Sequence, residues 1–138
     1  MPTDEEMLQK AAEARRRAYA PYSHFTVGAA LLTKSGKLFT GCNIESASYS
    51  PSNCAERTAF FKAVSEGERS FVQIAVAGGQ EHEEPSEECP PCGVCRQVMM
   101  EFCDPDTFRI ILAGSGGSPH AFKLKELLPR GFGPKNLK

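Results

Sequence analysis

The sequence contains no tryptophan, only 3 histidines and no surplus of basic residues. Its 16 Lys and Arg are balanced by 17 Asp and Glu, which leaves a formal net charge of -1. A chain with this balance lacks the positive field that drives binding to a phosphate backbone, so we expect no nucleic-acid partner. No apolar run approaches the roughly 18 residues of a membrane span, and the first residues are acidic where a secretory signal is basic. We therefore expect a soluble, cytoplasmic protein without a membrane partner.

The length of 138 residues lies in the range of a single domain, which we expect to cover residues 1–138. Hydrophobic residues make up 41% and charged residues 24%, proportions that exclude a disordered or collagen-like chain. Its 6 cysteines are spread unevenly through a chain large enough to fold without disulfide bonds. Thiol chemistry or metal binding is therefore a better interpretation than a disulfide framework.

The hydrophobic pattern predicts helices that alternate with strands. Apolar residues spaced by three and four predict helices over 4–19, 54–65, 92–103 and 123–128. Short apolar runs predict strands over 25–33, 38–43, 71–77 and 109–113, the first two joined as a hairpin. An acidic surface loop is expected over 81–88. This order predicts an α/β fold, with helices layered on a mixed sheet.

Cysteines stand at the predicted starts of two helices. Cys92 and Cys95 are three residues apart, so both can face one metal ion, and Cys54 at the other helix start could supply a third sulfur. Three protein ligands leave the fourth position of a tetrahedral zinc open to water, as in catalytic sites. Glu56, close to Cys54, could then act as general acid and base.

The negative charge of such a site has to be offset by positive groups nearby. Three thiolates around one divalent zinc leave a net negative charge, which opposes the ionisation of a bound water. Two helix N-termini point their positive ends at the sulfurs, and Arg57 can fold back to donate hydrogen bonds to them. Gln97 is a second candidate donor.

Two plainer interpretations of the cysteines stay open on this reasoning alone. Cys92 and Cys95 could form a redox pair, although the strand that usually precedes such a motif is not predicted here. Cys89 could close the zinc site as a fourth sulfur, which would make it structural. We expect Cys42 and Cys103 to be small buried hydrophobic residues. His24, His82 and His120 stand outside any ligand spacing, so we expect them to be surface or hydrogen-bonding residues.

The two motifs, Cys54-Ala55-Glu56-Arg57 and Pro91-Cys92-Gly93-Val94-Cys95-Arg96-Gln97, resemble the zinc motifs of the small cytidine deaminases. Three further segments are similar to that family: 19–31 to its first hairpin strand, 41–49 to its ribose-binding segment and 127–132 to its C-terminus. The resemblance implies a three-layer α/β/α sandwich with a mixed central sheet of about five strands, assembled as a homotetramer.

The resemblance also implies an activity: zinc-dependent hydrolytic deamination of cytidine and 2'-deoxycytidine to uridine and 2'-deoxyuridine, with release of ammonia, in pyrimidine salvage. One Zn2+ per subunit would be held by Cys54, Cys92 and Cys95. Glu56 would carry the proton from the attacking water toward ring atom N3 and then to the departing amine.

The same resemblance implies a set of substrate-binding residues. They are Phe25 against the pyrimidine, Asn43 and Glu45 on the ribose hydroxyls, Ala55, and Tyr49 and Phe132 from a neighbouring subunit. Without the resemblance, Asn43 and Glu45 would be interpreted as solvated polar positions, and Phe25 as a core residue.

The chain departs from the family pattern at three places: Ser46 stands where asparagine is usual, Val94 where alanine is common, and segment 81–90 is longer and more acidic. Two other classes of function compete with the nucleoside deaminase. One is a noncatalytic module stabilised by zinc, and the other is a deaminase of polynucleotides or of a nucleoside antibiotic. The absence of a basic stripe and the presence of Asn43 and Glu45 argue against a polynucleotide substrate.

Overall fold

The computed structural model describes residues 1–85 and 87–137. Its centre is a five-stranded sheet in the order β2-β1-β3-β4-β5. The strands are β1 (Phe25–Thr33), β2 (Leu38–Cys42), β3 (Phe71–Gln80), β4 (Arg109–Ala113) and β5 (Pro119–Lys123). β3 and β4 run parallel, whereas the other neighbouring strands are antiparallel. The sheet is therefore mixed, as the sequence predicts.

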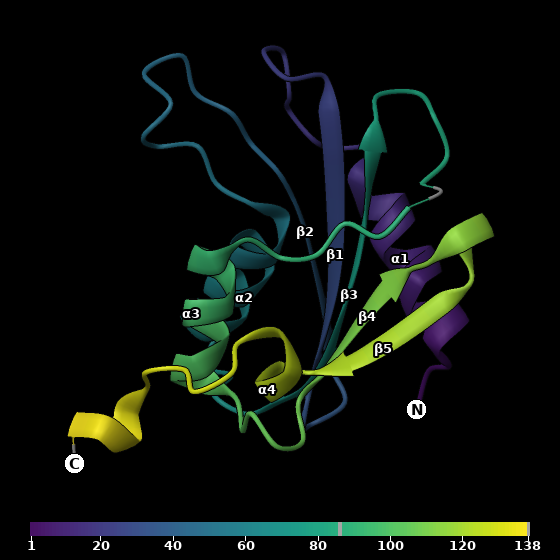
Figure 1. Ribbon diagram of the computed structural model, residues 1–138. Helices are drawn as coiled ribbons and strands as arrows, with labels where there is room; N and C mark the ends of the chain where they lie inside the picture. The colour runs from purple at the N-terminus through teal and green to yellow at the C-terminus, as the bar shows by residue number, and fades with distance from the viewer. Residues whose placement is uncertain (86, 138) are drawn as a thin grey trace.

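Helices cover both faces of this sheet (Figure 1). The helices are α1 (Asp4–Arg15), α2 (Ala55–Ser65), α3 (Gly93–Phe102) and α4 (Leu124–Leu127), with short 3-10 turns at Ser115–Gly117 and Pro134–Leu137. Along β3, Ile74 and Val76 enter the core under α2, α3 and α4, while Ala75 and Ala77 enter the core under α1. The three central strands β1, β3 and β4 thus contribute side chains to both cores, and the predicted three-layer α/β/α sandwich is confirmed.

The first helix begins where the sequence predicts but ends early. The Thr3 hydroxyl accepts from the Glu6 amide at 3.1 Å and the Glu6 carboxylate accepts from the Thr3 amide at 2.8 Å, which caps the first turn. The helix stops at Arg15, so its predicted continuation to Tyr19 is wrong. Instead, the Tyr19 amide donates to the Asn43 carbonyl at 2.9 Å. This pairing ties the segment after α1 to the end of β2.

The later part of the chain holds a strand that the sequence pattern did not predict. The sequence pattern assigns no element to residues 118–122, between the predicted strand over 109–113 and the predicted helix over 123–128, but β5 (Pro119–Lys123) pairs with β4 at the edge of the sheet. A proline fits here because it opens an edge strand, where its missing N–H leaves no ladder bond unmade. Segment 81–88 is a loop as predicted, apart from residue 86, which lies outside the described residues. Among the described residues, no helix has the length and apolar character that crossing a membrane requires.

Glycines bring the first hairpin into direct contact with a helix on each face. A Cβ at Gly28 would lie 1.9 Å from the Ala11 carbonyl oxygen and 2.5 Å from the Arg15 amide nitrogen, both in α1. On the opposite face, a Cβ at Gly41 would lie 2.4 Å from the carbonyl oxygen of Ala55 in α2. The hairpin is therefore fixed between α1 and the helix that carries Glu56.

Replacing Gly28 by alanine should destabilise the protein, because rigid helix backbone occupies the space that the methyl group needs. We expect a loss of about 1 to 3 kcal/mol in the free energy of unfolding, measured by urea denaturation. Gly93→Ala is the matched control, since a Cβ there meets nothing within 4 Å. Equal midpoints for the two variants would contradict the close contact.

Candidate metal centre and active site

Three cysteine sulfurs from two helices form one compact group. The Sγ atoms of Cys54 and Cys92 are 3.7 Å apart, and those of Cys92 and Cys95 are 3.5 Å apart. A tetrahedral zinc with Zn–S bonds of about 2.3 Å holds its sulfurs roughly 3.8 Å from one another, whereas a disulfide brings them to about 2.05 Å. The spacing fits three ligands of one zinc ion and is too long for a disulfide bond.

Both helices begin at these cysteines, as the sequence predicts. Cys54 is the N-cap of α2 and Cys92 the N-cap of α3, and the Cys92 sulfur accepts a hydrogen bond from the Cys95 amide at 3.4 Å. Helix N-termini stabilise thiolates because their free N–H groups and dipoles present positive charge. Hydrogen bonds from the Cys95 thiol and from Arg57 lower the pKa of Cys54 to about 5. This sulfur is therefore prepared to bind a cation.

Arg57 lies against the same sulfurs. Its Nη2 atom donates to the Cys54 sulfur at 3.3 Å, the contact that its position after Cys54 suggested. Its Nε atom is buried and has no hydrogen-bond partner among the described residues. A guanidinium held this way places positive charge beside the thiolates and offsets part of their repulsion.

Cys89 is not part of the sulfur group. Within the described chain, the residues whose ligand atoms come together are Cys54, Cys92 and Cys95. Cys89 instead lines the neighbouring cavity, where burial raises the pKa of its thiol to about 11. The closed site with a fourth sulfur is therefore not formed.

The remaining cysteines and the histidines also lie outside this group. Cys42 and Cys103 are partly buried, less than the full burial that their residue type suggested. The histidines are exposed, as predicted, and each has a glutamate partner: His24 and His82 with Glu81, and His120 with Glu88.

Glu56 is a buried carboxyl group next to the sulfurs. It lies in the first turn of α2 and is only 4% exposed. Burial raises its pKa to about 7. A carboxyl group that titrates near neutral pH can both accept and return a proton, which is the behaviour expected of a general acid and base.

A cavity of about 290 Å³ opens beside Glu56 and the sulfurs. Its lining includes four residues that the sequence predicted for the site together with Glu56, namely Asn43, Glu45, Ala55 and Arg57, and two of the sulfur ligands. It also includes residues that sequence reasoning missed: Val27, Ser52, Asn53, Cys89 and Pro90. Asn53 and Pro90 directly flank the two cysteine motifs, so adjacency to a motif was the signal that could have found them.

Asn43 and Glu45 are anchored at the mouth of the cavity. The Asn43 side chain accepts from the Val27 amide at 2.8 Å and donates to the Phe25 carbonyl at 2.9 Å. The Glu45 carboxylate accepts from the Ser23 hydroxyl and amide, and these hydrogen bonds lower its pKa. Both side chains are thereby held in one orientation, and Glu45 is ionised at neutral pH.

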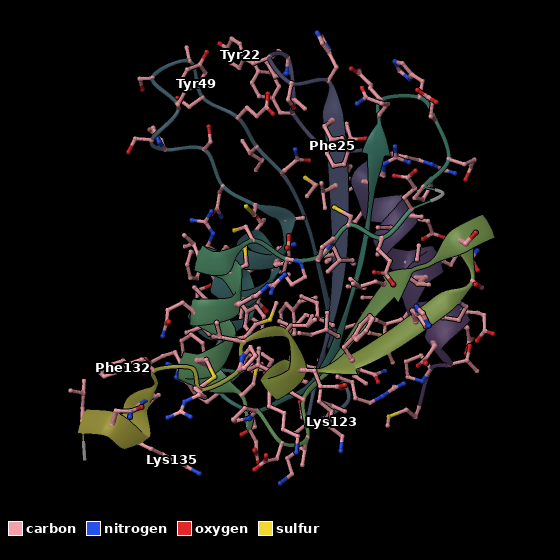
Figure 2. The ribbon with its side chains drawn as sticks, viewed as in Figure 1. Tyr22, Phe25, Tyr49, Lys123, Phe132 and Lys135 are labelled. Atoms are coloured by element: carbon pink, nitrogen blue, oxygen red, sulfur yellow. The ribbon has the colours of Figure 1, made fainter. Side chains whose placement is uncertain are left out.

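The aromatic residues and Gln97 lie outside this lining. Phe25 stands at the start of β1, and Tyr49 sits on an outer loop with its ring centre 6.2 Å from that of Tyr22 (Figure 2). Phe132 lies in the C-terminal segment at the far end of the same view, and its carbonyl accepts from the Gln97 side chain at 2.7 Å. The Gln97 amide nitrogen is therefore directed at the C-terminal segment in this chain.

Three thiols at two helix N-termini, with a buried carboxyl group and a cavity beside them, define a metal-dependent hydrolase of the α/β class. Residues 1–110 match the family model described as "Cytidine and deoxycytidylate deaminase zinc-binding region". The chain therefore belongs to the cytidine and deoxycytidylate deaminase family, whose members are zinc-dependent enzymes.

Individual relatives agree with this placement. A cytidine deaminase from Halalkalibacterium halodurans is 49% identical over 131 residues, which cover 95% of each chain. One from Sporosarcina psychrophila is 45% identical over 133 residues, 96% of this chain and 93% of the relative. The crystal structure of a cytidine deaminase from Burkholderia pseudomallei superposes with a TM-score of 0.85 at 46% identity, covering 95% of this chain and 100% of that one.

Removing one sulfur should abolish tight metal binding, because two thiols cannot complete the ligand set. We expect the purified protein to hold one zinc per chain by elemental analysis, and Cys92→Ser to hold much less. Cys103→Ser is the matched control, since this thiol lies outside the sulfur group. Equal metal content in both variants would contradict the assignment of the ligands.

Proposed function

We propose that the protein catalyses hydrolytic deamination of cytidine and 2'-deoxycytidine to uridine and 2'-deoxyuridine, with release of ammonia. The observation that carries this proposal is the placement of buried Glu56 beside three clustered sulfurs at one wall of a cavity. Membership of the deaminase family supports the reaction class, and the names of the relatives described above support cytidine as the substrate.

The cofactor in this proposal is one Zn2+ per chain, held by Cys54, Cys92 and Cys95. When bound there, zinc supplies Lewis acidity that lowers the pKa of a water molecule toward neutrality. The donor set supports this choice, because tetrahedral sulfur sites are typical of zinc. Arg57 and the helix N-termini of α2 and α3 stabilise the negative charge of the thiolates.

Glu56 moves the protons of the reaction. It takes a proton from the water that adds to ring atom C4 and delivers it to ring atom N3. It then passes a second proton to the amine, which leaves as ammonia while a carbonyl forms at C4, so one water is consumed for each ammonia released. Burial suits both tasks, since it keeps the pKa of Glu56 near the working pH.

Other residues in and beside the cavity recognise the sugar and the base. Asn43 and Glu45 hydrogen-bond the ribose hydroxyls, using the donor and acceptor positions that their backbone contacts leave free. Phe25 packs against the pyrimidine, and Ala55 contacts it from the first turn of α2. A ligand without ribose would leave two fixed polar groups unpaired, so the free base should be a poor substrate.

We further propose a single deaminase-like domain over residues 1–138 that assembles as a homotetramer and works in cytoplasmic pyrimidine salvage. Tyr49 and Phe132 would each reach the active site of a neighbouring subunit. Their exposure supports this role, since the two aromatic side chains are 73% and 56% exposed in the single chain.

Sedimentation of purified protein tests the assembly, with Tyr49→Ala and Phe132→Ala as variants. We expect a tetramer for the unchanged protein, and a raised KM for cytidine in each variant because the completed pocket loses an aromatic wall. A monomer with full activity would contradict the intersubunit sites.

Glu56→Gln should reduce kcat for cytidine by roughly 100- to 10,000-fold, because the amide cannot carry the proton. Zinc content should stay unchanged, since Glu56 is not in the sulfur group. Loss of cytidine absorbance measures the rate, and Glu101→Gln, an exposed position on α3, is the control expected to keep full activity. The same assay with cytosine should show little turnover. A Glu56→Gln variant with normal kcat would refute the proposed function.

A further inference from the structure

Arg96 joins the cavity wall to the C-terminal part of the fold. From the first half of α3, its Nε atom donates to the Pro91 carbonyl at 2.7 Å, and its Nη1 atom donates to the Leu127 carbonyl at the end of α4. Pro91 is buried and directly precedes Cys92, one of the three clustered sulfurs. One guanidinium therefore bridges a metal-ligand segment and a separate helix.

The segment Cys89–Pro90–Pro91, called the wall segment below, packs against the fold but has few backbone hydrogen bonds. Cys89 and Pro90 line the cavity, and Pro90 and Pro91 have no amide hydrogen to donate. Among the described residues, the bond from Arg96 is the hydrogen bond that the backbone of Cys89, Pro90 and Pro91 receives. The prolines limit the backbone angles of this segment, and the hydrogen bond from Arg96 ties it to α3.

Arg96 makes these two contacts as hydrogen bonds to backbone carbonyls, without forming an ion pair in the described chain. No carboxylate lies within 4.0 Å of Arg96 in the described chain, so its charge faces two backbone carbonyls. Hydrogen bonds from a charged donor are shorter and stronger than neutral ones. Gln97 adds a parallel tie from the next residue, since it donates to the Phe132 carbonyl. Arg96 and Gln97 of α3 thus both donate to the C-terminal part of the chain. Of these two residues, Arg96 also donates to Pro91 beside the cavity.

We propose that Arg96 is a positioning residue: by holding the Pro91 carbonyl it fixes the orientation of Cys92 toward the metal and of the Cys89–Pro90 wall toward the nucleoside. It touches neither. Without it, the segment before α3 loses its hydrogen bond, the Cys92 sulfur samples other directions, and the metal dissociates faster. The effect on the nucleoside rests on the proposed function, whereas the effect on the metal does not.

The test compares Arg96→Met with Arg69→Met in zinc-loaded protein. Arg69 is the matched control because its guanidinium also donates to two backbone carbonyls, those of Val64 and Glu68, at a distance from the cavity lining. Transfer of zinc to a coloured chelator measures metal release. We expect Arg96→Met to release zinc roughly 10- to 100-fold faster than the unchanged protein, the range typical of residues that orient metal ligands, and Arg69→Met to match the unchanged protein.

Two further measurements separate positioning from general stability. KM for cytidine should rise more than kcat falls in Arg96→Met, because the wall binds substrate while Glu56 is untouched. Arg96→Lys keeps the stem and charge but cannot donate to two segments in the same geometry, so it should fold and still release zinc faster.

Zinc release from Arg96→Lys at the unchanged rate, or equal acceleration by Arg69→Met, would overturn the proposal. If the unchanged protein failed to turn over cytidine, the proposed function would fail instead, and the zinc-release comparison would still decide the role of Arg96.

Discussion

The structure depends on bringing three thiol groups within bonding distance of one cation. Thiolates at this spacing repel one another, and burial beside a carboxyl group makes the repulsion worse. The fold meets this constraint by aiming the N-termini of α2 and α3 at the same point from one face of the sheet, with Arg57 against the Cys54 sulfur. Positive ends of helices and a guanidinium thus surround the sulfurs before any metal arrives.

The layered sheet holds α2 and α3 in the positions that bring the sulfurs together. α2 lies directly on Gly41 of β2, and α3 is tied through Arg96 and Gln97 to the segment that follows β5. The cavity forms where these helix starts meet the beginning of β1 and the segment after β2, so Glu45 and Glu56 come from different elements yet line one cavity. The starts of α2 and α3 carry the sulfurs and Glu56, and the segment after β2 carries Asn43 and Glu45.

Sequence reasoning succeeded for the site where the determinants are local. Cys54 and Cys92 mark helix starts because a helix N-cap and a metal-ligand motif coincide there, and Arg57 reaches its sulfur within one helical turn. The family resemblance supplied the sheet of about five strands, and the topology confirms it.

Sequence reasoning failed where the structure is decided by contacts between residues that are distant in the chain. The end of α1 is decided by pairing of Tyr19 with residues after β2, and β5 is a mostly exposed edge strand without an apolar pattern. The contact between Gln97 and the Phe132 carbonyl joins elements that no spacing rule relates. In each case the structure differs from the sequence-based prediction because of tertiary contacts, which a single sequence does not display.

The glycines on the first hairpin have a consequence for how the chain avoids misfolding. Strands slip most easily by two residues, because such a slip keeps every side chain on its own face. Here a two-residue slip would push Thr26 or Ala30 under α1 at the place of Gly28, and Phe39 or Asn43 under α2 at the place of Gly41. The backbones of α1 and α2 leave no room for a side chain at these two positions. A hairpin with shifted strands would therefore clash with a helix on each face, and only the native alignment lets both helices pack on the sheet.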